Sequence, residues 1–292
     1  MWLKLVAVGV VAYVIYQMND MFDLNDLKGK RVVLTGASTG IGEQMAYHYA
    51  NNKANLLITA RRTNVLQKVI DRCKSLGDPN GNYNYITADM GNLSATENVI
   101  KEAEEKMGGI DFLVLNHIKE ISLGEWSGST DNLTLLSNLF DINFKAYVHL
   151  ASYALPLLEK SGGSIIVVSS IAGKLAQPYL SVYSATKFAL DGFFSGLRME
   201  LELKKCNVSV TLCVIGLIGT ENAVSKLKEF GKGTLLDLVK PARPEDAAMA
   251  IIKGGALRER EIYFPYFSAK LYTVFRDLFR GLLEGSIKFM YR

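Results

Sequence analysis

Short apolar segments alternate with helical segments along most of this chain. Residues rich in β-branched and aliphatic side chains predict strands at 31–35, 55–60, 83–88, 111–116, 164–170, 207–215 and 261–264. Between them, apolar positions recur every three to four residues, which is the period of an amphipathic helix. Strands of this length separated by helices are typical of βαβ units in a parallel sheet. Because no internal repeat or low-complexity linker interrupts the pattern, we predict one α/β domain over residues 27–265.

The first residues form an apolar segment of a different kind. Leu5 to Tyr16 is an unbroken apolar run, and with its neighbours it is just long enough to span a bilayer, which needs about 17 to 25 residues. Lys4 precedes the run and acidic residues follow it, so the charge asymmetry predicts a cytosolic N-terminus and a chain body across the membrane. We predict a signal-anchor at residues 1–18. Cleavage as a signal peptide, followed by secretion, is the alternative, because the apolar run is short.

The end of the chain, residues 266–292, also differs from the central part. Its apolar residues form one helical stripe, and its charged residues lie mostly off that stripe. We therefore predict an amphipathic helical tail. Packing of the stripe on the chain's own core and contact with a membrane or a second subunit are both compatible with this pattern.

Composition and charge narrow the classes of function. The chain has 292 residues, of which 49% are hydrophobic and 21% are charged, as suits a globular core. Its net charge is +4 without a dense run of Lys or Arg, so nucleic acid is not an expected partner. The three cysteines and three histidines show no metal-ligand spacing, and we predict no metal site. Asn92, Asn132 and Asn207 begin glycan-acceptor sequons, which a luminal domain would expose to glycosylation.

A glycine-rich turn follows the first predicted strand. The segment TGASTGIG places Gly36, Gly40 and Gly42 between that strand and the first helix of the domain. Glycines at this point allow a tight turn and a close approach of phosphate to the helix N-terminus. This context predicts a dinucleotide site in a Rossmann-type, doubly wound parallel sheet.

Two arginines end the second predicted strand. In dinucleotide-binding folds an acidic residue near this point binds the ribose hydroxyls of NAD, whereas arginine accommodates the 2′-phosphate of NADP. Arg61 and Arg62 occupy the position here, with no carboxylate beside them. The sequence therefore favours NADP(H), and solvated surface arginines are the alternative interpretation.

A tyrosine and a lysine lie one helical turn apart in the segment YSATKFALDGFF. Tyr183 and Lys187 share one helix face, because residues four apart in a helix are neighbours. An ammonium beside a phenol favours the phenolate and lowers its pKa, which prepares a general acid/base for neutral pH. A lysine lying beside a packed tyrosine, with no chemical role, is the alternative.

These motifs occur together in a known order. TGASTGIG, LNHI, Asn143 in FDINF, Ser170 thirteen residues before Tyr183, and the Tyr183/Lys187 pair resemble the short-chain dehydrogenase/reductase family over nearly all of residues 27–265. The segments LNHI, VVSSIAGK, YSATKFALDGFF and NVSVTLCVIGLIGT are similar to one subgroup, the 11β-hydroxysteroid dehydrogenases of type 1 and their type 1-like relatives.

The resemblance implies roles for individual residues. Tyr183 would exchange a proton with the substrate oxygen, Ser170 would hydrogen-bond that oxygen, and Gln177 would line the substrate pocket. Lys187 would lower the pKa of Tyr183 and bind the nicotinamide ribose, while Asn143 would hold a water that connects Lys187 to solvent. The implied cofactor-binding set, in chain order, is Gly36, Ser38, Thr39, Gly40, Ile41, Gly42, Arg61, Arg62, Asp89, Met90, Asn116, His117, Ile118, Tyr183, Lys187, Ile218, Gly219 and Thr220.

The resemblance also implies an activity and a location. We expect an NADP(H)-dependent oxidoreductase that interconverts a hydroxyl and a ketone on a lipophilic, steroid-like substrate. A homodimer in the endoplasmic reticulum membrane, with its catalytic domain in the lumen, would fit the subgroup. Thr39, Gly219 and Gln177 depart from the type 1 enzyme, which leaves open a carbonyl reductase of retinoids, lipids or xenobiotics. A nucleotide-binding scaffold without turnover is a third, different class.

Overall fold

The computed structural model describes residues 22–119, 123–231, 236 and 239–291. The predicted signal-anchor at residues 1–18 lies outside them. Among the described residues, no helix combines the length and the hydropathy that crossing a bilayer requires.

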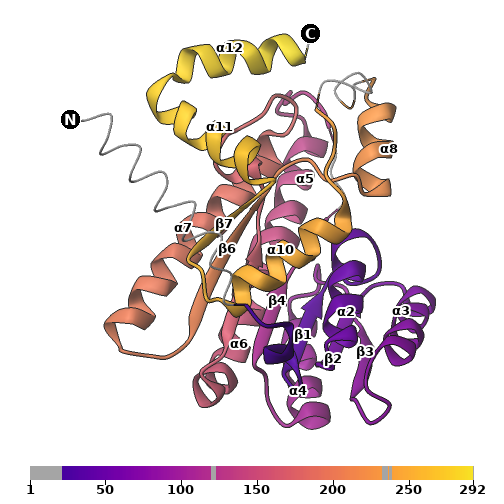
Figure 1. Ribbon diagram of the computed structural model, residues 1–292. Helices are drawn as coiled ribbons and strands as arrows, with labels where there is room; N and C mark the ends of the chain where they lie inside the picture. Colours follow the sequence, from indigo (N-terminus) through magenta and orange to yellow (C-terminus); the bar gives the residue numbers. More distant parts are fainter. Residues whose placement is uncertain (1–21, 120–122, 232–235, 237–238, 292) are drawn as a thin grey trace.

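Within the described part of the chain, seven parallel strands form one sheet in the order β3-β2-β1-β4-β5-β6-β7 (Figure 1). Each strand lies within two residues of its predicted limits, and the predicted α/β domain with a parallel sheet is confirmed. The strand order reverses at β1, which pairs with β2 on one side and β4 on the other. The strands are β1 (Arg31–Thr35), β2 (Asn55–Ala60), β3 (Tyr83–Thr87), β4 (Phe112–Leu115), β5 (Ser164–Val168), β6 (Ser209–Ile215) and β7 (Glu261–Phe264).

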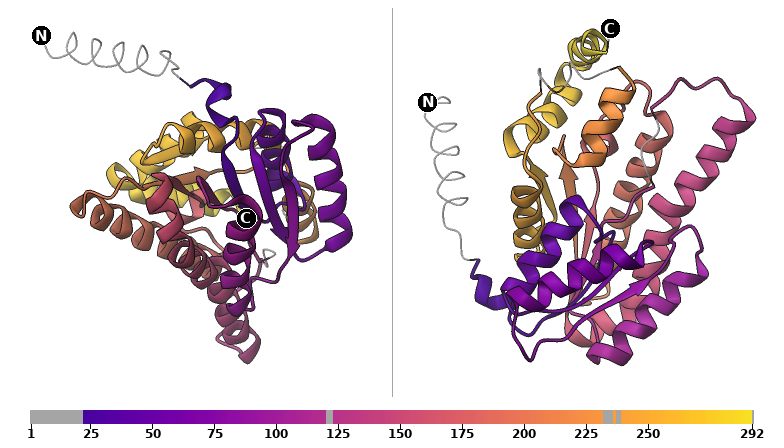
Figure 2. Two further views of the ribbon diagram at one scale, coloured as in Figure 1. Left: turned by 90° about the horizontal axis from the view of Figure 1, so that it is seen from below. Right: turned by 90° about the vertical axis from the view of Figure 1, so that its right-hand side faces the viewer.

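Helices cover both faces of the sheet, as Figures 1 and 2 show. Helices α2 (Gly40–Asn51), α3 (Thr63–Leu76) and α10 (Pro244–Ala256) contribute to one buried cluster, with Val32 and Leu34 of β1. Helices α4 (Ser94–Met107), α6 (Ala146–Ser161) and α7 (Ser181–Leu203) contribute to the other, with Val33. Successive strand residues thus enter opposite cores, which explains why the strands are continuously apolar and not alternating.

The remaining elements connect these layers. Helix α5 (Thr130–Phe140) continues through a π-helical turn, η2 (Asp141–Lys145), into α6. The 3-10 turn η1 (Leu24–Leu27) precedes β1, and the 3-10 turn η3 (Ile171–Gly173) follows β5. Helix α8 (Glu221–Glu229) follows β6.

The tail forms two helices, although the sequence predicted one. Helix α11 (Tyr266–Leu278) and helix α12 (Arg280–Met290) meet at Phe279, whose φ of −138° and ψ of 45° lie outside the helical region. Gly281, with its low helix propensity, lies just past this break. In both figures α8, α11 and α12 lie at the same end of the molecule.

The two faces of the tail's apolar stripe lie in different surroundings. Leu283 and Ile287 of α12 pack on Leu175, so one face covers the protein's own core. The other face is apolar and exposed, at Phe267, Leu271, Val274, Phe275, Leu278, Phe279, Leu282 and Phe289.

A paired charge joins β1 to the start of β4 at the amino ends of the strands. Arg31 Nε and Nη2 each lie 2.9 Å from a carboxylate oxygen of Asp111, and the Arg31 backbone N–H donates to the same carboxylate at 2.8 Å. Burial by itself would raise the pKa of Asp111, but the hydrogen bonds from Arg31 outweigh it and lower that pKa. The pair therefore stabilises the fold only while Asp111 is ionised.

Replacing Asp111 by Asn is expected to lower the free energy of unfolding by about 2 kcal/mol at pH 7, because Arg31 keeps a partly buried charge without its partner. The folded-state pKa of Asp111 lies below the unfolded value, so its contribution is complete above about pH 4 and is lost as pH falls through the folded pKa. Urea unfolding at pH 7 and pH 3 measures both effects, and the variant should differ less from the parent at pH 3.

Glu202→Gln is the matched control, since Glu202 pairs with Arg260 at 3.1 Å on the surface. The free energy of unfolding of this variant should fall by less than about 0.5 kcal/mol, as for most exposed ion pairs. Equal losses in the two variants at pH 7 would contradict the structural role given to Asp111.

Candidate active site

The glycine-rich turn joins β1 to α2 at the point where the strand order reverses. Gly36 and Gly40 have φ values of +66° and +63°, which favour glycine. A side chain at Gly42 would collide with the carbonyl oxygen of Gly36. Helix α2 begins at Gly40, and its N-cap, Thr39, makes no side-chain capping hydrogen bond. The first N–H groups of α2 are thus left without a side-chain partner at this cap, as a phosphate site requires.

Segments from other strands close around this turn. The side-chain amide of Asn116, which follows β4, donates to the carbonyl oxygens of Thr35 at 3.3 Å and of Gly36 at 3.2 Å. On another side, the Thr220 side chain lies next to Gly40. Ile218 forms a bridge with Ala242, which holds this part of the segment after β6. The structure therefore brings the predicted glycine turn, Asn116 and Thr220 together.

The predicted NADP-selecting arginines lie beside the turn. Arg61 and Arg62 are exposed where β2 passes into α3, and Arg62 Nη2 lies 3.4 Å from Ser38 Oγ. After β3, the Asp89 carboxylate accepts a hydrogen bond from the Gly91 backbone at 2.9 Å, and Met90 is buried. This edge of the turn offers two cations to a negatively charged group.

The candidate catalytic residues come from the end of β5 and from α7. Ser170 begins η3, and its hydroxyl oxygen accepts a hydrogen bond from the Ala172 backbone at 3.1 Å. Gly173 packs so closely on α7 that a side chain there would lie 2.9 Å from the Lys187 carbonyl oxygen. Lys187 Nζ lies 5.8 Å from the centre of the Tyr183 ring, so both side chains share one face of α7 as predicted.

Lys187 is a buried cation with few partners. Lys187 is only 1% exposed, and this burial lowers the pKa of its ammonium to about 7. Among the described residues its ammonium makes one hydrogen bond, to the Val168 carbonyl oxygen at 3.0 Å. An ammonium has three donors, so Lys187 can donate to further groups such as ribose hydroxyls.

The predicted lowering of the tyrosine pKa by Lys187 is not what the structure shows. Burial raises the pKa of Tyr183 above its ordinary value, and the polar Ser170 hydroxyl opposes this shift. The physical reason is that burial disfavours the charged forms of both groups, since it also lowers the pKa of Lys187. At neutral pH Tyr183 is therefore a phenol that can give a proton.

Asn143 lies inside the π-helical turn η2 and is fully buried. Its side-chain oxygen accepts a hydrogen bond from the Lys119 backbone at 2.8 Å, and its amide nitrogen lies 3.5 Å from Thr186 Oγ1. Thr186 directly precedes Lys187 on α7, so Asn143 is placed beside the helix that carries Tyr183 and Lys187. Insertions of this kind into a helix are frequent at functional sites.

Two side chains of the site were not foreseen in these roles. The His117 ring bonds to Thr35 Oγ1 at 2.9 Å and to the Ile142 carbonyl at 3.0 Å, and burial lowers its pKa to about 3. Because a carbonyl only accepts, Nε2 carries the proton. Tyr147 donates to the His117 carbonyl at 2.7 Å, and its ring centre lies 5.5 Å from Lys187 Nζ. Nothing in the sequence distinguishes Tyr147 from an ordinary core aromatic of a helix.

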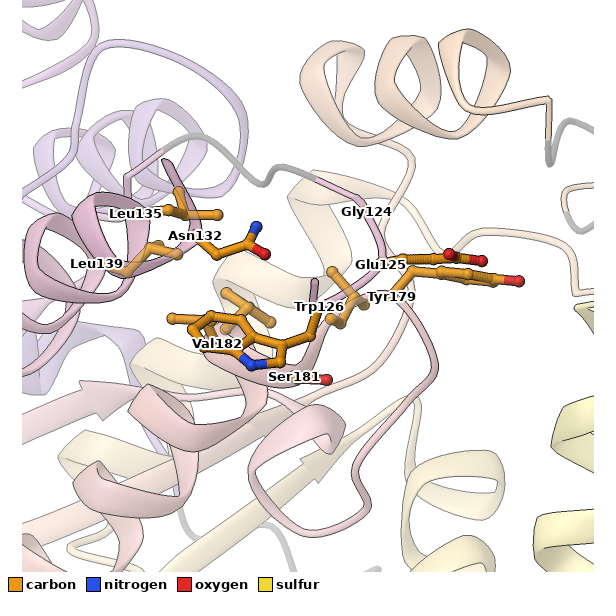
Figure 3. A pocket seen from close by; sticks show the side chains of 11 residues that line it. Gly124, Glu125, Trp126, Asn132, Leu135, Leu139, Tyr179, Ser181 and Val182 are labelled. Atoms are coloured by element: carbon orange, nitrogen blue, oxygen red, sulfur yellow. The ribbon is translucent and has the colours of Figure 1, made fainter. Parts of the chain in front are cut away.

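Tyr183 is one of the residues that line a pocket, which Figure 3 shows from close by. Its wall comes from the segment before α5, from α5 itself and from the start of α7, and its lining includes Trp126, Leu135, Leu139, Tyr179, Val182 and Tyr183. In Figure 3 the Trp126 ring lies on the side of Val182, whereas the Tyr179 side chain points in the opposite direction. Gln177 is not part of this lining, and its side-chain oxygen accepts a hydrogen bond from Tyr291 at 3.0 Å.

The residues present fit a dinucleotide. The glycine turn leaves a helix N-terminus accessible to phosphate, the adjacent arginines offer positive charge, and Lys187 offers ammonium donors near Tyr183. Beyond Lys187, the phenol of Tyr183 and the hydroxyl of Ser170 lie beside the pocket that Tyr183 lines. The described residues include no cluster of three or more His, Cys, Asp or Glu that could hold a metal.

Comparisons with known proteins agree with this geometry. The family model described as short chain dehydrogenase matches residues 30–229. Three curated relatives carry the name hydroxysteroid 11-beta-dehydrogenase 1-like protein. The one from Danio rerio is 45% identical over 92% of this chain and 90% of its own. The one from Xenopus tropicalis is 44% identical over 99% of this chain and 96% of its own length. The one from Gallus gallus is 47% identical over 90% of this chain and 88% of its own length.

One solved structure is similar over most of the domain. It is a short chain dehydrogenase from Burkholderia cenocepacia J2315 in complex with NADP, with a TM-score of 0.70 and 25% identity. The alignment covers 81% of this chain and 96% of that one. The expected resemblance to the 11β-hydroxysteroid dehydrogenase 1-like subgroup is confirmed by the curated relatives. Sequence family, fold and site geometry agree, and the chain belongs to the short-chain dehydrogenase family.

Proposed function

We propose that this protein is an NADP(H)-dependent oxidoreductase that interconverts a hydroxyl and a ketone on a lipophilic, steroid-like substrate. The observation that carries the proposal is the placement of Tyr183 on the pocket wall, one turn from the buried Lys187 and within the electrostatic influence of the Ser170 hydroxyl. A non-catalytic scaffold would not require a buried lysine with one hydrogen bond among the described residues, beside a tyrosine in a pocket.

Each protein group has a distinct task in this reaction. The bound cofactor supplies or accepts the hydride, while the protein contributes orientation and proton handling. Ser170 holds the substrate oxygen through its hydroxyl, and Tyr183 gives that oxygen a proton during reduction or takes one during oxidation. Because burial raises the pKa of Tyr183, its protonated form at neutral pH suits the reduction of a ketone.

Lys187 and Asn143 support this proton transfer. With a pKa lowered to about 7, Lys187 exchanges protons readily near neutral pH and can return one to Tyr183. When the nicotinamide ribose is bound, donation from the Lys187 ammonium would orient it. Asn143, beside Thr186 at 3.5 Å, would hold the water through which Lys187 reaches solvent.

The pocket lining and the relatives support a lipophilic substrate. Trp126, Leu135, Leu139 and Val182 give the pocket an apolar wall next to Tyr183. The curated relatives carry the name hydroxysteroid 11-beta-dehydrogenase 1-like protein, which refers to steroids. A carbonyl reductase of retinoids, lipids or xenobiotics is the second candidate, because Thr39, Gly219 and Gln177 depart from the type 1 enzyme. Turnover of purified protein with NADPH on a panel of ketosteroids and simple ketones separates the two.

Membrane attachment and location also belong to the proposal. The apolar run before residue 18 would anchor the chain in the endoplasmic reticulum membrane with the domain in the lumen. The exposed apolar face of α11 and α12 supports a second contact of the chain with lipid. The homodimer implied by the family resemblance stays a prediction.

Cofactor preference follows from the two arginines. NADPH should be used with a kcat/KM at least tenfold above that for NADH, because arginine accommodates the 2′-phosphate. The double variant Arg61→Ala, Arg62→Ala should lose most of this preference through a higher KM for NADPH. Arg72→Ala, an exposed arginine on α3, is the control. Equal use of NADH by the parent, or an unchanged preference in the double variant, would contradict the assignment.

The hydroxyl of Tyr183 is expected to be essential. Tyr183→Phe should reduce kcat by about a thousandfold while NADPH binding, followed by fluorescence titration, changes little, because only the proton donor is lost. Tyr153→Phe, an exposed tyrosine of α6, should keep full activity. A Tyr183→Phe variant within a few fold of the parent would refute the acid/base role.

Luminal orientation predicts glycosylation at a particular sequon. Asn207 is exposed before β6, whereas Asn132 lines the pocket and its side-chain oxygen accepts from Ser127. We expect glycan at Asn207 in a eukaryotic host and none at Asn132. Glycosidase treatment should increase gel mobility of the parent and of Asn132→Gln. If Asn207→Gln shows the same shift as the parent, the site assignment is wrong. Protease accessibility in intact microsomes tests the orientation itself.

A further inference from the structure

The buried face of the tail helices α11 and α12 packs against the segment that connects Ser170 to Tyr183. Arg276 of α11 donates from Nη1 to the Lys174 carbonyl at 2.5 Å. Next along the segment, Leu175 is buried against Leu283 and Ile287 of α12. These contacts join parts of the chain about a hundred residues apart in sequence. The tail therefore bears directly on the connection between the two candidate catalytic residues.

Tyr291, at the end of α12, extends this contact to the pocket wall. Its hydroxyl donates to Gln177 Oε1 at 3.0 Å. Its ring centre lies 5.9 Å from that of Tyr179, which lies 5.1 Å from that of Phe230, just past α8. Three segments distant in sequence thus meet around one aromatic side chain, Tyr179.

Tyr179 has a backbone conformation that needs such support. Its φ of +63° lies in the left-handed region, which a residue with a Cβ rarely adopts. Strain of this kind persists where the surroundings hold it, and it is frequent at ligand sites. The Tyr179 carbonyl also accepts a hydrogen bond from Gly124 at 3.1 Å. Tyr179 and Gly124 both line the pocket that contains Tyr183 (Figure 3).

We propose that Tyr291 is a positioning residue that determines specificity for bulky substrates. It acts through Gln177 and Tyr179, which it holds so that the part of the pocket wall formed by Tyr179 keeps one shape. A substrate large enough to touch this wall loses binding when the wall relaxes, whereas a small ketone needs only Ser170 and Tyr183. The kinetic part of this inference rests on the proposed function.

The first measurement is hydrogen–deuterium exchange of the full-length protein in detergent, and it needs no substrate. In Tyr291→Ala, exchange over residues 174–180 should rise about tenfold, and exchange in β1 and β4 should stay unchanged. Tyr291→Phe keeps the ring beside Tyr179 and loses the hydrogen bond to Gln177, so its increase should be smaller. Phe289→Ala is the control, because Phe289 lies on the same helix and is 77% exposed.

The second measurement compares a large and a small probe, cortisone and cyclohexanone, with NADPH. Tyr291→Ala should raise KM for cortisone about tenfold with kcat within threefold, and should leave KM for cyclohexanone within twofold. A merely structural role would lower kcat for both probes together with the folded fraction.

Unchanged exchange over residues 174–180 in Tyr291→Ala overturns the proposal. So does an equal change in KM for the two probes. Because Tyr183→Phe tests the proposed function through turnover and exchange is measured without substrate, failure of either idea is recognised separately. If neither probe is reduced, the exchange result alone decides whether Tyr291 holds the wall.

Discussion

The burial of Lys187 is the constraint on which the rest of the site depends. A lysine that is 1% exposed, with the Val168 carbonyl as its hydrogen-bond partner among the described residues, makes its charged form unfavourable, and its pKa falls to about 7. A fold keeps such a group only when the surrounding packing fixes its place. The close contact of Gly173 with the Lys187 backbone and the Tyr147 ring near Nζ supply that packing. Stability is given up at this point, as is common where a site needs a reactive group.

The same constraint decides the protonation of Tyr183. A fully charged ammonium nearby would have favoured the phenolate, but the burial that lowers the pKa of Lys187 to about 7 also raises the pKa of the phenol. The pair therefore holds its protons in a form that suits donation, with a lysine able to replace the proton near neutral pH. His117 adds no competing charge, because burial keeps its ring neutral and its two nitrogens bond to Thr35 and Ile142.

The strands and the shared helix face of Tyr183 and Lys187 could be predicted from the sequence because each depends on local pattern. Strands buried on both faces are read as apolar runs, and the Tyr183/Lys187 spacing fixes a shared helix face whatever surrounds it. The burial of Lys187 could not be predicted in this way, since it depends on η3 and α6 closing over α7. The break at Phe279 is equally hidden, because the apolar stripe continues through it. The contact between Tyr291 and Gln177 joins residues so far apart that no spacing rule could pair them.

The two faces of the tail explain how one segment can serve both the pocket and a surface. Leu283 and Ile287 turn inward onto Leu175, whereas Leu282 and Phe289 turn outward with exposed fractions of 76% and 77%. An apolar stripe too wide for one interface leaves the remainder exposed, and a lipid surface is the environment in which that remainder costs least. In that arrangement the helix that lies against the bilayer also holds Gln177 and, through its last aromatic ring, contacts Tyr179 on the pocket wall. Entry of a lipophilic substrate and the shape of the pocket that receives it would then depend on opposite faces of the same helix.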